Sequence, residues 1–419
     1  MQKDLKRVRV AIIGGGIHGA GILHDLTSRG WKDVILLEKN RIGVGTSSRS
    51  TKLVHGGLRY LQRISQFGMV RESLKERKTL MDIVPDIVKP IELILPILKR
   101  GGRNRLTIKA GLTLYDALAG SYHLKKHSGL STAEAKAKIP CINTEKINCA
   151  FSFYDGQMDD LALVRRVAAS GRFLGGELVE GATVTSVNKD QDGWIIDYKD
   201  EMGNVQHLKA LVVINAAGPW AHEILNQSNL IPTHRAINNQ GSHLIFPDMG
   251  IKSGLFLESP KDGRIFFLIP WQGVTLLGTT EKLWSEAPND VKISEEEIDY
   301  LINGCNEYLD PLLKKESIIQ TFSGLRWLAV DQGQSISSTS REHSIGYHYS
   351  GRGYLLTIYG GKYTSYRSLC EKIGDEITKS FGEFRDTRTH EQGAWIPAHL
   401  LEKTLDPVQR FEYRDWHQI

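Results

Sequence analysis

Glycines near the N-terminus have the spacing of a turn that binds a dinucleotide. Gly14, Gly16 and Gly19 lie between a short apolar run rich in β-branched residues and a segment that can continue as a helix. The first glycine permits a tight turn, the second lets the backbone approach a pyrophosphate, and the third lets the helix pack closely on the strand. The pyrophosphate would rest on free N–H groups at the helix N-terminus, in the segment that contains Ile17 and His18.

An acidic residue at the end of a second apolar run completes this pattern. Residues 34–37 are expected to form a buried strand, and Glu38 follows it, about 20 residues after the last glycine, where an acid hydrogen-bonds a ribose hydroxyl. A lone Gly-x-Gly-x-x-Gly is a weak signal because glycine turns are common. Here the strand, glycines, helix, second strand and acid occur in the right order. We therefore predict that an ADP-containing dinucleotide binds here, with Lys39 beside it.

The stretch 46–61 is dense in hydroxyls and small residues, so it can wrap a long cofactor and bring its backbone close to a flat ring. It reads Thr-Ser-Ser-Arg-Ser-Thr-Lys-Leu-Val-His-Gly-Gly-Leu-Arg-Tyr-Leu. This block closely resembles one in the FAD-dependent glycerol-3-phosphate dehydrogenases of the D-amino-acid oxidase (DAO) superfamily. The resemblance continues in blocks to about residue 396. It implies that the dinucleotide is FAD.

The resemblance also implies that the cofactor contacts come from several separate segments. The strand at 182–187 would pass the adenine, and a turn after the strand at 211–215 would lie against the cofactor. A helix after residue 364 would point backbone N–H groups at the flavin edge that gathers negative charge on reduction. Beyond the first turn, the implied cofactor-binding residues are Thr46, Ser47, Ser48, Lys52, Leu53, His55, Gly56, Val184, Ala216, Ala217, Gly218, Gly360, Gly361, Lys362, Tyr363 and Thr364.

Oxidation of a phosphorylated alcohol also needs fixed cations, because the fork of an arginine side chain suits a phosphate. By resemblance, Arg326 and Arg341 hold the phosphate, whereas Arg59 and Lys362 face the hydroxyls near the flavin. The implied substrate-binding residues are Arg59, Tyr60, Thr280, Arg326, Arg341 and Lys362. The resemblance thus implies oxidation of sn-glycerol 3-phosphate to dihydroxyacetone phosphate, with hydride transfer to FAD N5 and then electron transfer to quinone or another acceptor.

Two histidines are candidates for the base that accepts the hydroxyl proton. His243 is equally consistent with a structural histidine in a sheet, and His55 with a residue packed along the flavin without proton transfer. Arg59 could instead stabilise a developing alkoxide. The candidate catalytic residues are therefore His55, Arg59, His243 and Lys362.

Three departures from the family pattern lie near the predicted roof of the substrate site. Glu281 replaces an aspartate, Asn239 and Gln240 stand where a basic residue is common, and Trp327 replaces a proline. The substrate is therefore less firmly predicted than the flavin. One alternative is a flavoenzyme that acts on a 2-hydroxy acid or an amino acid. Another is a flavin-binding protein without turnover.

The expected fold is mixed α/β, with a discontinuous Rossmann-like FAD-binding domain of the DAO and glutathione-reductase type and a β-rich substrate domain. The expected FAD-binding domain comprises residues 1–75, 151–220 and 325–385. The expected substrate or cap domain comprises residues 76–150 and 221–324. Residues 386–419 are expected to form a charged, aromatic tail, and the helical C-terminal domain that the resemblance implies has no counterpart in the 419-residue sequence.

The composition narrows the range of partners and locations. The formal net charge of +5 is mild, and no long basic run favours nucleic acid. The four cysteines lack CxxC spacing and are expected to be reduced thiols, and no metal site is expected. The sequence has no long apolar run of a signal peptide or transmembrane helix. We expect a cytoplasmic protein, or one that is peripheral on the inner face of the cell membrane.

A basic cluster between apolar stretches bears on membrane contact. It consists of Lys99, Arg100, Arg103, Arg105 and Lys109. One interpretation is a solvated loop between buried elements. The other is an interfacial patch on anionic lipid, which the resemblance favours because these dehydrogenases are typically peripheral membrane enzymes.

Overall fold

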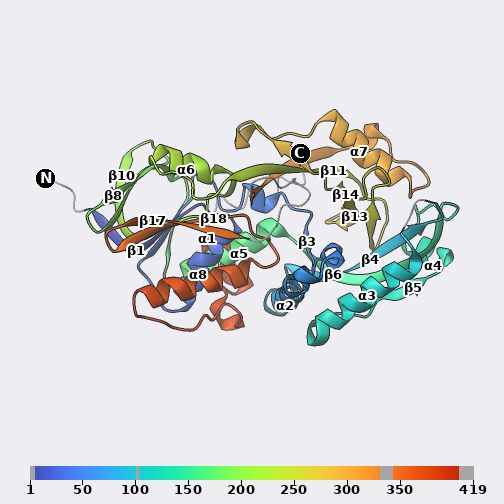
Figure 1. The fold of residues 1–419 in the computed structure, drawn as a ribbon, viewed down its shortest axis with the longest axis horizontal. Helices are drawn as coiled ribbons and strands as arrows, with labels where there is room; N and C mark the ends of the chain where they lie inside the picture. Colours follow the sequence, from blue (N-terminus) through green and yellow to red (C-terminus); the bar gives the residue numbers. More distant parts are fainter. Residues whose placement is uncertain (1–4, 101–102, 331–342, 405–419) are drawn as a thin grey trace. The chain divides into compact units, whose positions relative to one another are not determined.

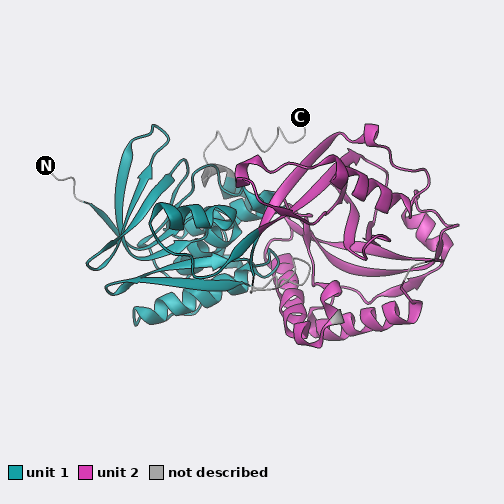
Figure 2. Cartoon of the chain, turned by 45° about the horizontal axis from the view of Figure 1, so that its top comes forward, with its two compact units in different colours: residues 1–48, 160–237, 327–419 teal, residues 49–159, 238–326 magenta. Residues whose placement is uncertain are grey.

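The computed structural model describes residues 5–100, 103–330 and 343–404 (Figure 1). The chain forms two compact units (Figure 2). Unit 1 comprises residues 1–48, 160–237 and 327–419, and unit 2 comprises residues 49–159 and 238–326. The structure thus places residues 49–75 in unit 2, whereas the sequence analysis placed them in the cofactor domain.

Unit 1 contains a largely parallel sheet. Its strands are β1 (Lys6–Ile13), β2 (Val34–Leu37), β7 (Glu177–Val179), β8 (Thr183–Asp190), β9 (Gly193–Lys199), β10 (Val205–Asn215), β17 (Ser344–Ser350) and β18 (Gly353–Tyr359). The order is β17-β18-β10-β1-β2-β7, and β8 and β9 form a hairpin beside β10. The strand expected at 211–215 begins earlier than predicted, because β10 runs without a break from Val205 and pairs with both β9 and β1.

The helices of unit 1 are α1 (Ile17–Ser28), α5 (Asp160–Phe173), α6 (Ala221–Gln227), α8 (Tyr366–Ser380) and α9 (Ala398–Thr404). α1 contacts both α5 and α8 (Figure 1), and its small residues permit this close packing. Part of the expected C-terminal tail also packs in this unit. Trp395 lies edge-on to His24 of α1, and the Ile396 N–H donates to Ser170 Oγ of α5 at 3.0 Å.

Unit 2 is built on a second, mixed sheet. Its strands are β3 (Leu53–Val54), β4 (Val88–Leu98), β5 (Ser128–Leu130), β6 (Ile147–Met158), β11 (Ala236–Pro247), β12 (Gly254–Glu258), β13 (Ile265–Trp271), β14 (Val274–Gly278), β15 (Lys282–Trp284) and β16 (Gln320–Ala329). The order is β15-β11-β14-β13-β12-β4-β6-β3, with β16 beside β11 and β5 beside β6. The helices are α2 (Phe67–Ile83), α3 (Arg105–Ala119), α4 (Thr132–Lys138) and α7 (Glu295–Asn306).

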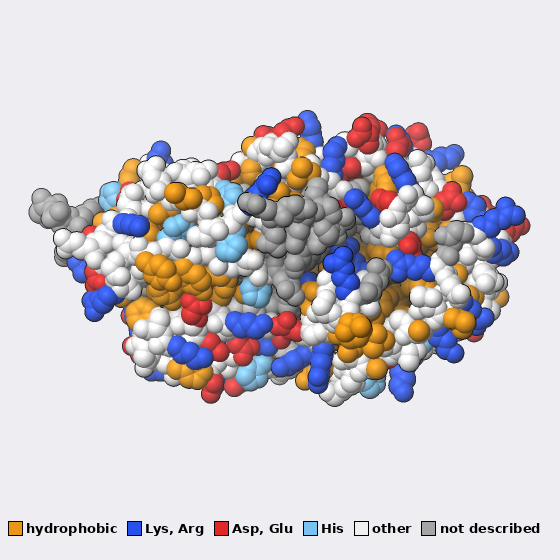
Figure 3. All heavy atoms as spheres, in the orientation of Figure 1, with side chains coloured by type: hydrophobic (Ala, Val, Ile, Leu, Met, Phe, Trp, Pro, Cys, Tyr) orange, Lys and Arg blue, Asp and Glu red, His pale blue; other side chains and the backbone are white. Residues whose placement is uncertain are grey.

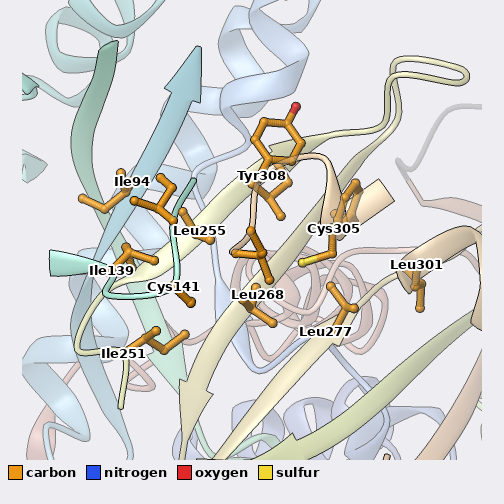
Figure 4. Packing of buried hydrophobic residues seen from close by; sticks show 14 of the residues in the cluster. Ile94, Ile139, Cys141, Ile251, Leu255, Leu268, Leu277, Leu301, Cys305 and Tyr308 are labelled. Atoms are coloured by element: carbon orange, nitrogen blue, oxygen red, sulfur yellow. The ribbon is translucent and has the colours of Figure 1, made fainter. Parts of the chain in front are cut away.

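Alternating side chains give this sheet two hydrophobic faces, as expected where both sides of a strand are covered. In β4, Leu93 and Leu95 join a cluster that includes α2 and α3 residues, whereas Ile94 joins the cluster on the other face. Figure 4 shows that second cluster, where Leu268 of β13 and Cys305 of α7 meet. The helices therefore cover both faces of the sheet.

Charges of both signs are mixed on the surface, and the cysteines are free thiols, as expected. Figure 3 shows Lys and Arg side chains interspersed with Asp and Glu side chains over the visible face. All four cysteines are buried free thiols. No helix in the described ranges is long and apolar enough to cross a membrane.

Candidate active site

The turn between β1 and α1 has no room for side chains. Gly14 has φ of +103°, and a Cβ there would lie 2.7 Å from the carbonyl oxygen of Ala216. A Cβ on Gly19 would lie 1.9 Å from the Gly14 carbonyl oxygen. The turn therefore packs directly against the 216–218 segment, and both glycines are required by close backbone approach. This brings two predicted cofactor-binding segments together.

The first turn of α1 has no side-chain cap of its own. Its N-cap is Gly16, which has no capping side chain, and the Ile17 N–H donates to Ser47 Oγ at 2.9 Å. Glu38, at the end of β2, accepts from the N–H groups of Gly15 at 2.6 Å and Asn40 at 2.8 Å. Burial raises the pKa of the Glu38 carboxyl above its usual value. Glycines, helix N-terminus and acid thus fit the pyrophosphate and ribose of an ADP group.

Other predicted residues lie around this acid. The Ala182 N–H donates to the Glu38 carbonyl oxygen at 2.8 Å, which places the start of β8, with Val184, beside the end of β2. The Lys39 ammonium lies 4.2 Å from the centre of the Trp220 ring, just after the Ala216–Gly218 segment. These contacts join a third segment to the ADP-binding side of unit 1.

The turn after β18 lies against the start of α1. Gly360 and Gly361 have φ of +75° and +103°, and a Cβ on Gly361 would lie 2.5 Å from the His18 ring. Burial, with a smaller effect of His343, lowers the pKa of His18 to about 4, so its ring is neutral near pH 7. The Tyr363 hydroxyl donates to the Asp160 carbonyl oxygen at 2.5 Å. The 360–364 turn is therefore fixed beside the glycine turn, where a long dinucleotide can contact both.

In unit 2, His243 lies in a buried, aromatic environment. Its ring stacks on Phe322 with 4.6 Å between centroids and 11° between planes, and its Nε2 lies 3.0 Å from Thr51 Oγ1. Burial, followed by the charges of Arg326 and Lys52, lowers the pKa of His243 well below its ordinary value. The His243 imidazole is therefore held in its neutral form near pH 7.

Lys52 lies near the same aromatic group in an unusual conformation. Its φ is +59°, a value that residues other than glycine rarely adopt. Its buried ammonium lies 5.0 Å from the Trp271 ring and 5.3 Å from the Phe322 ring. The local structure thus holds a cation close to His243.

The half-buried Arg326 lies over a backbone position without a side chain. Its Nη2 donates to Thr279 Oγ1 at 3.3 Å, and a Cβ on Gly241 would lie 2.7 Å from the same nitrogen. The guanidinium therefore contacts the β11 backbone and a hydroxyl of the loop after β14. Fixed in this way, its planar fork suits a phosphate or carboxylate.

A buried polar network supports this part of unit 2. Glu297 Oε1 accepts from Ser242 Oγ at 2.8 Å and Thr280 Oγ1 at 2.6 Å, and its Oε2 accepts from Gln240 Nε2 at 3.0 Å. The predicted substrate residue Thr280 therefore uses its hydroxyl to hold β11 and α7 together, since it also accepts from the Ser242 N–H at 2.9 Å.

Two departures noted in the sequence are paired with each other. Asn239 Nδ2 donates to Glu281 Oε1 at 3.0 Å. The side chains at positions 239 and 281 are thus joined by a hydrogen bond within unit 2. Trp327 lies in unit 1, where it stacks on Tyr359 at 4.6 Å between centroids.

The remaining predicted residues are placed as follows. Leu53, His55, Gly56, Arg59 and Tyr60 lie in unit 2, in β3 and in the loop and 3₁₀ helix that follow it, and Arg59 lies 5.1 Å from the Tyr60 ring. Thr46 and Ser48 flank Ser47 in a 3₁₀ turn of unit 1, and Lys362 and Thr364 lie in the turn after β18. Arg341 lies outside the described residues. Among the residues described, no group of three or more His, Cys, Asp or Glu side chains could hold a metal ion.

Sequence reasoning missed the residues that hold these groups in place. Thr51 lies in the hydroxyl-rich stretch 46–61 but was not among the predicted site residues, and neither was Glu297. Asp155, whose Oδ1 accepts from the Gly56 N–H at 3.0 Å, fell within the segment 151–220 that was assigned to the cofactor domain, and it was not among the predicted site residues. A charged residue within an otherwise apolar strand was the available signal, because such a group is rarely buried without partners.

Comparisons with known proteins agree with this geometry. The FAD dependent oxidoreductase (DAO) family matches residues 9–367. The chain is 33% identical over 386 residues to D-erythritol 1-phosphate dehydrogenase of Brucella abortus, covering 91% of this chain and 75% of that protein. It is 33% identical over 399 residues to aerobic glycerol-3-phosphate dehydrogenase of Escherichia coli K12, covering 94% and 78% respectively.

A solved structure shows the same fold. Glycerol-3-phosphate dehydrogenase from Bacillus halodurans, complexed with FAD, superposes with a TM-score of 0.73 at 25% identity. The match covers 92% of this chain and 67% of that chain. The glycine turn, the acid at the end of β2 and the family match lead to one conclusion. The chain belongs to the family of FAD-dependent oxidoreductases, and FAD is its cofactor.

Proposed function

We propose that this enzyme oxidises sn-glycerol 3-phosphate to dihydroxyacetone phosphate. The observation that carries the proposal is the fixed guanidinium of Arg326 above Gly241, in a block that resembles the family's phosphate-binding arginine. Relatives named for glycerol-3-phosphate and D-erythritol 1-phosphate dehydrogenation support a phosphate ester as the substrate. In this proposal unit 1 supplies the glycine turn for FAD, and unit 2 supplies Arg326 for the substrate phosphate.

The proposed chemistry divides between cofactor and side chains. FAD, when bound, supplies an acceptor for the hydride that leaves the substrate carbinol. Arg326, with Arg341, neutralises the phosphate, and Arg59 and Lys362 orient the hydroxyls. His243, neutral in its buried site and 3.0 Å from the Thr51 hydroxyl, takes the hydroxyl proton. His55 is the second candidate for this role.

A second substrate is favoured by one relative. D-Erythritol 1-phosphate dehydrogenase of Brucella abortus matches this chain at the same identity as the glycerol-3-phosphate dehydrogenase of Escherichia coli. The two compounds in these names share a phosphate ester on a sugar alcohol and differ in carbon-chain length. Recognition by Arg326 is common to both, so the remaining contacts to the hydroxyls decide between them.

Turnover with an artificial dye acceptor tests this proposal. We expect sn-glycerol 3-phosphate to give the highest kcat/KM, D-erythritol 1-phosphate a lower value, and glycerol no turnover. A higher kcat/KM for the erythritol ester would replace the proposed substrate with the longer one. Turnover only with lactate or an amino acid would contradict the proposed phosphate ester.

We propose a quinone as the physiological electron acceptor. A cavity of about 440 Å³ in unit 2 is lined by Leu58, Arg59, Ile97, Ile108, Phe256 and Ile265. Its mostly apolar wall suits a quinone ring and isoprenoid tail, and Arg59 connects it to the predicted substrate loop. Filling the cavity by Ile265→Trp should slow the reduction of a short-chain quinone while dye reduction is retained. Equal rates of quinone reduction by the variant and the wild type would contradict this assignment.

Peripheral membrane contact is proposed for the outer face of α3. Leu106 is 73% exposed, and exposed Arg105 and Lys109 flank it on the same helix. An apolar side chain among cations is typical of a helix that lies on anionic lipid. We expect sedimentation with vesicles that contain phosphatidylglycerol but not with phosphatidylcholine vesicles, and weaker binding for Leu106→Asp. Equal vesicle binding by Leu106→Asp and the wild type would contradict membrane contact through this surface.

A further inference from the structure

Asp155 joins three elements of unit 2 at one buried oxygen. It lies on β6 and is 2% exposed. Its Oδ1 accepts from Arg77 Nη1 of α2 at 2.8 Å, from the Tyr115 hydroxyl of α3 at 2.9 Å, and from the Gly56 N–H at 3.0 Å. Two of these donors are side chains of helices, and the third is the backbone of the loop that leads to Arg59.

The loop at Gly56 is closely confined by the same group. A Cβ on Gly56 would lie 2.3 Å from the Tyr115 hydroxyl and 2.4 Å from a methyl group of Leu74. Gly57 then takes a left-handed conformation with φ of +85°, and the 3₁₀ helix Leu58–Gln62 begins. The Gly56 amide is therefore a fixed point immediately before the turn that carries Arg59 and Tyr60.

The Arg77 side chain makes this point rigid. Its Nη1 also donates to the Tyr154 carbonyl oxygen at 3.0 Å, and its Nη2 donates to the Tyr122 carbonyl oxygen at 3.2 Å. A buried Arg–Asp pair alone is weak evidence for a gain in stability, because both charges lose their hydration. Here the carboxylate also accepts a loop N–H, which gives it a role in the position of the loop.

We propose that Asp155 is a positioning residue for Arg59. It holds the Gly56 amide so that the following turn presents the Arg59 guanidinium at a fixed place. The inference rests on the proposed function, in which Arg59 contacts the substrate hydroxyls. The structure links Asp155 to Arg59 through the Gly56 amide and the backbone of residues 56–59, so we expect the effect of Asp155 on turnover to depend on Arg59.

The test is a double-mutant cycle. Asp155→Asn should lower kcat per bound FAD roughly tenfold for the phosphate ester that the wild type oxidises, because small displacements of a catalytic group are costly. Tyr115→Phe should have the same effect more weakly. In an Arg59→Lys background, Asp155→Asn should lower kcat less than about twofold further. An equal fold-loss in both backgrounds would overturn the inference.

Thr275→Val is the matched control. Thr275 is buried in the same unit, and its hydroxyl accepts from a backbone N–H, that of Met249, at 3.1 Å. It should lower the melting temperature as much as Tyr115→Phe but leave kcat per bound FAD unchanged. If Asp155→Asn does not fold, Tyr115→Phe takes its place in the cycle. A loss of kcat in the control as large as that in Tyr115→Phe would overturn the inference.

A second readout does not depend on turnover. Hydrogen exchange in the peptide spanning residues 54–62 should be faster in Asp155→Asn and Tyr115→Phe than in the wild type, and unchanged in Thr275→Val. A wild type that oxidises neither phosphate ester contradicts the proposed function, and the exchange experiment then still tests whether Asp155 fixes this loop. Unchanged exchange in both variants would overturn the inference.

Discussion

The two units build their candidate binding surfaces by different means. In unit 1, the turn between β1 and α1 depends on the absence of side chains at Gly14 and Gly19, since a Cβ on either would overlap backbone atoms. In unit 2, the residues around Arg326 and His243 are held by side chains that hydrogen-bond to one another, with Glu297 at the centre of one network.

This difference predicts different responses to mutation. A backbone approach of less than 3 Å tolerates no added atom, so substitution in the glycine turn acts as an all-or-none change. A hydrogen-bonded network loses one partner at a time, so substitutions in unit 2 are graded. We expect single substitutions in the glycine turn to abolish FAD binding, and single substitutions in the unit 2 network to weaken substrate binding by degrees.

Gly19→Ala should have the largest effect. The added methyl group would lie 1.9 Å from the Gly14 carbonyl oxygen, so α1 must move away from β1 and the pyrophosphate-binding turn must open. We expect purified protein with almost no FAD, measured by visible absorbance relative to protein absorbance. Gly68→Ala is the control, because nothing lies within 4 Å of a Cβ there. Full FAD content in Gly19→Ala would contradict the proposed difference between the two units.

Arg326→Lys should change substrate recognition while leaving FAD bound. Loss of the guanidinium fork should cost about 2 kcal/mol, which corresponds to a KM for the phosphate ester roughly 30-fold higher. Steady-state kinetics with equal FAD content provides the measurement. Arg352→Lys, at a side chain that is 86% exposed, should leave KM unchanged. An unaltered KM in Arg326→Lys would remove this residue from the phosphate site.

Glu297→Gln should have a smaller effect, mainly on stability. The amide that replaces one carboxylate oxygen cannot accept the hydrogen bonds of Ser242 and Thr280 or of Gln240, so we expect a loss of about 1–3 kcal/mol in the free energy of unfolding. Urea denaturation measures this loss. Glu296→Gln, one residue away and 88% exposed, should change it by less than about 0.5 kcal/mol. Similar losses in both variants would contradict the central place of Glu297.

The pH dependence of stability should show the smallest effect. Burial lowers the pKa of His243 well below 6.5 in the folded state, whereas the unfolded chain binds this proton below about pH 6.5. The unfolded state is therefore favoured as the pH falls from 7 to 5. The free energy of unfolding should fall more steeply in the wild type than in His243→Gln, by up to about 1.4 kcal/mol per pH unit. Equal slopes would mean that His243 is not held neutral.

The sequence predicted the glycine turn well because its signals are local. Gly14 and Glu38 are read from spacing along adjacent strands, and the structure places the Glu38 carboxylate 2.6 Å from the Gly15 amide nitrogen. The polar networks could not be predicted in the same way. Gly56 and Asp155 are 99 residues apart, and Ser242 and Glu297 are 55 apart, so only the folded sheet brings them together.

The expected domain boundaries show the same limit of prediction from sequence. The hydroxyl-rich block was read as one cofactor loop and assigned with residues 1–75 to a single domain. In the structure, β3 pairs with β6, so the chain enters unit 2 after Ser48. Long-range strand pairing, which leaves no local trace in the sequence, decided this boundary.

The most direct test of the account is an anaerobic absorbance titration of the purified flavoprotein with sn-glycerol 3-phosphate, with glycerol in parallel. The account predicts that the phosphate ester bleaches the oxidised flavin spectrum of the wild type, whereas glycerol does not, and that Arg326→Lys stays yellow but needs far more ester. A wild-type flavin that remains oxidised with the ester would contradict the proposed substrate. Wild-type protein that takes up no FAD would contradict the proposed cofactor role of unit 1.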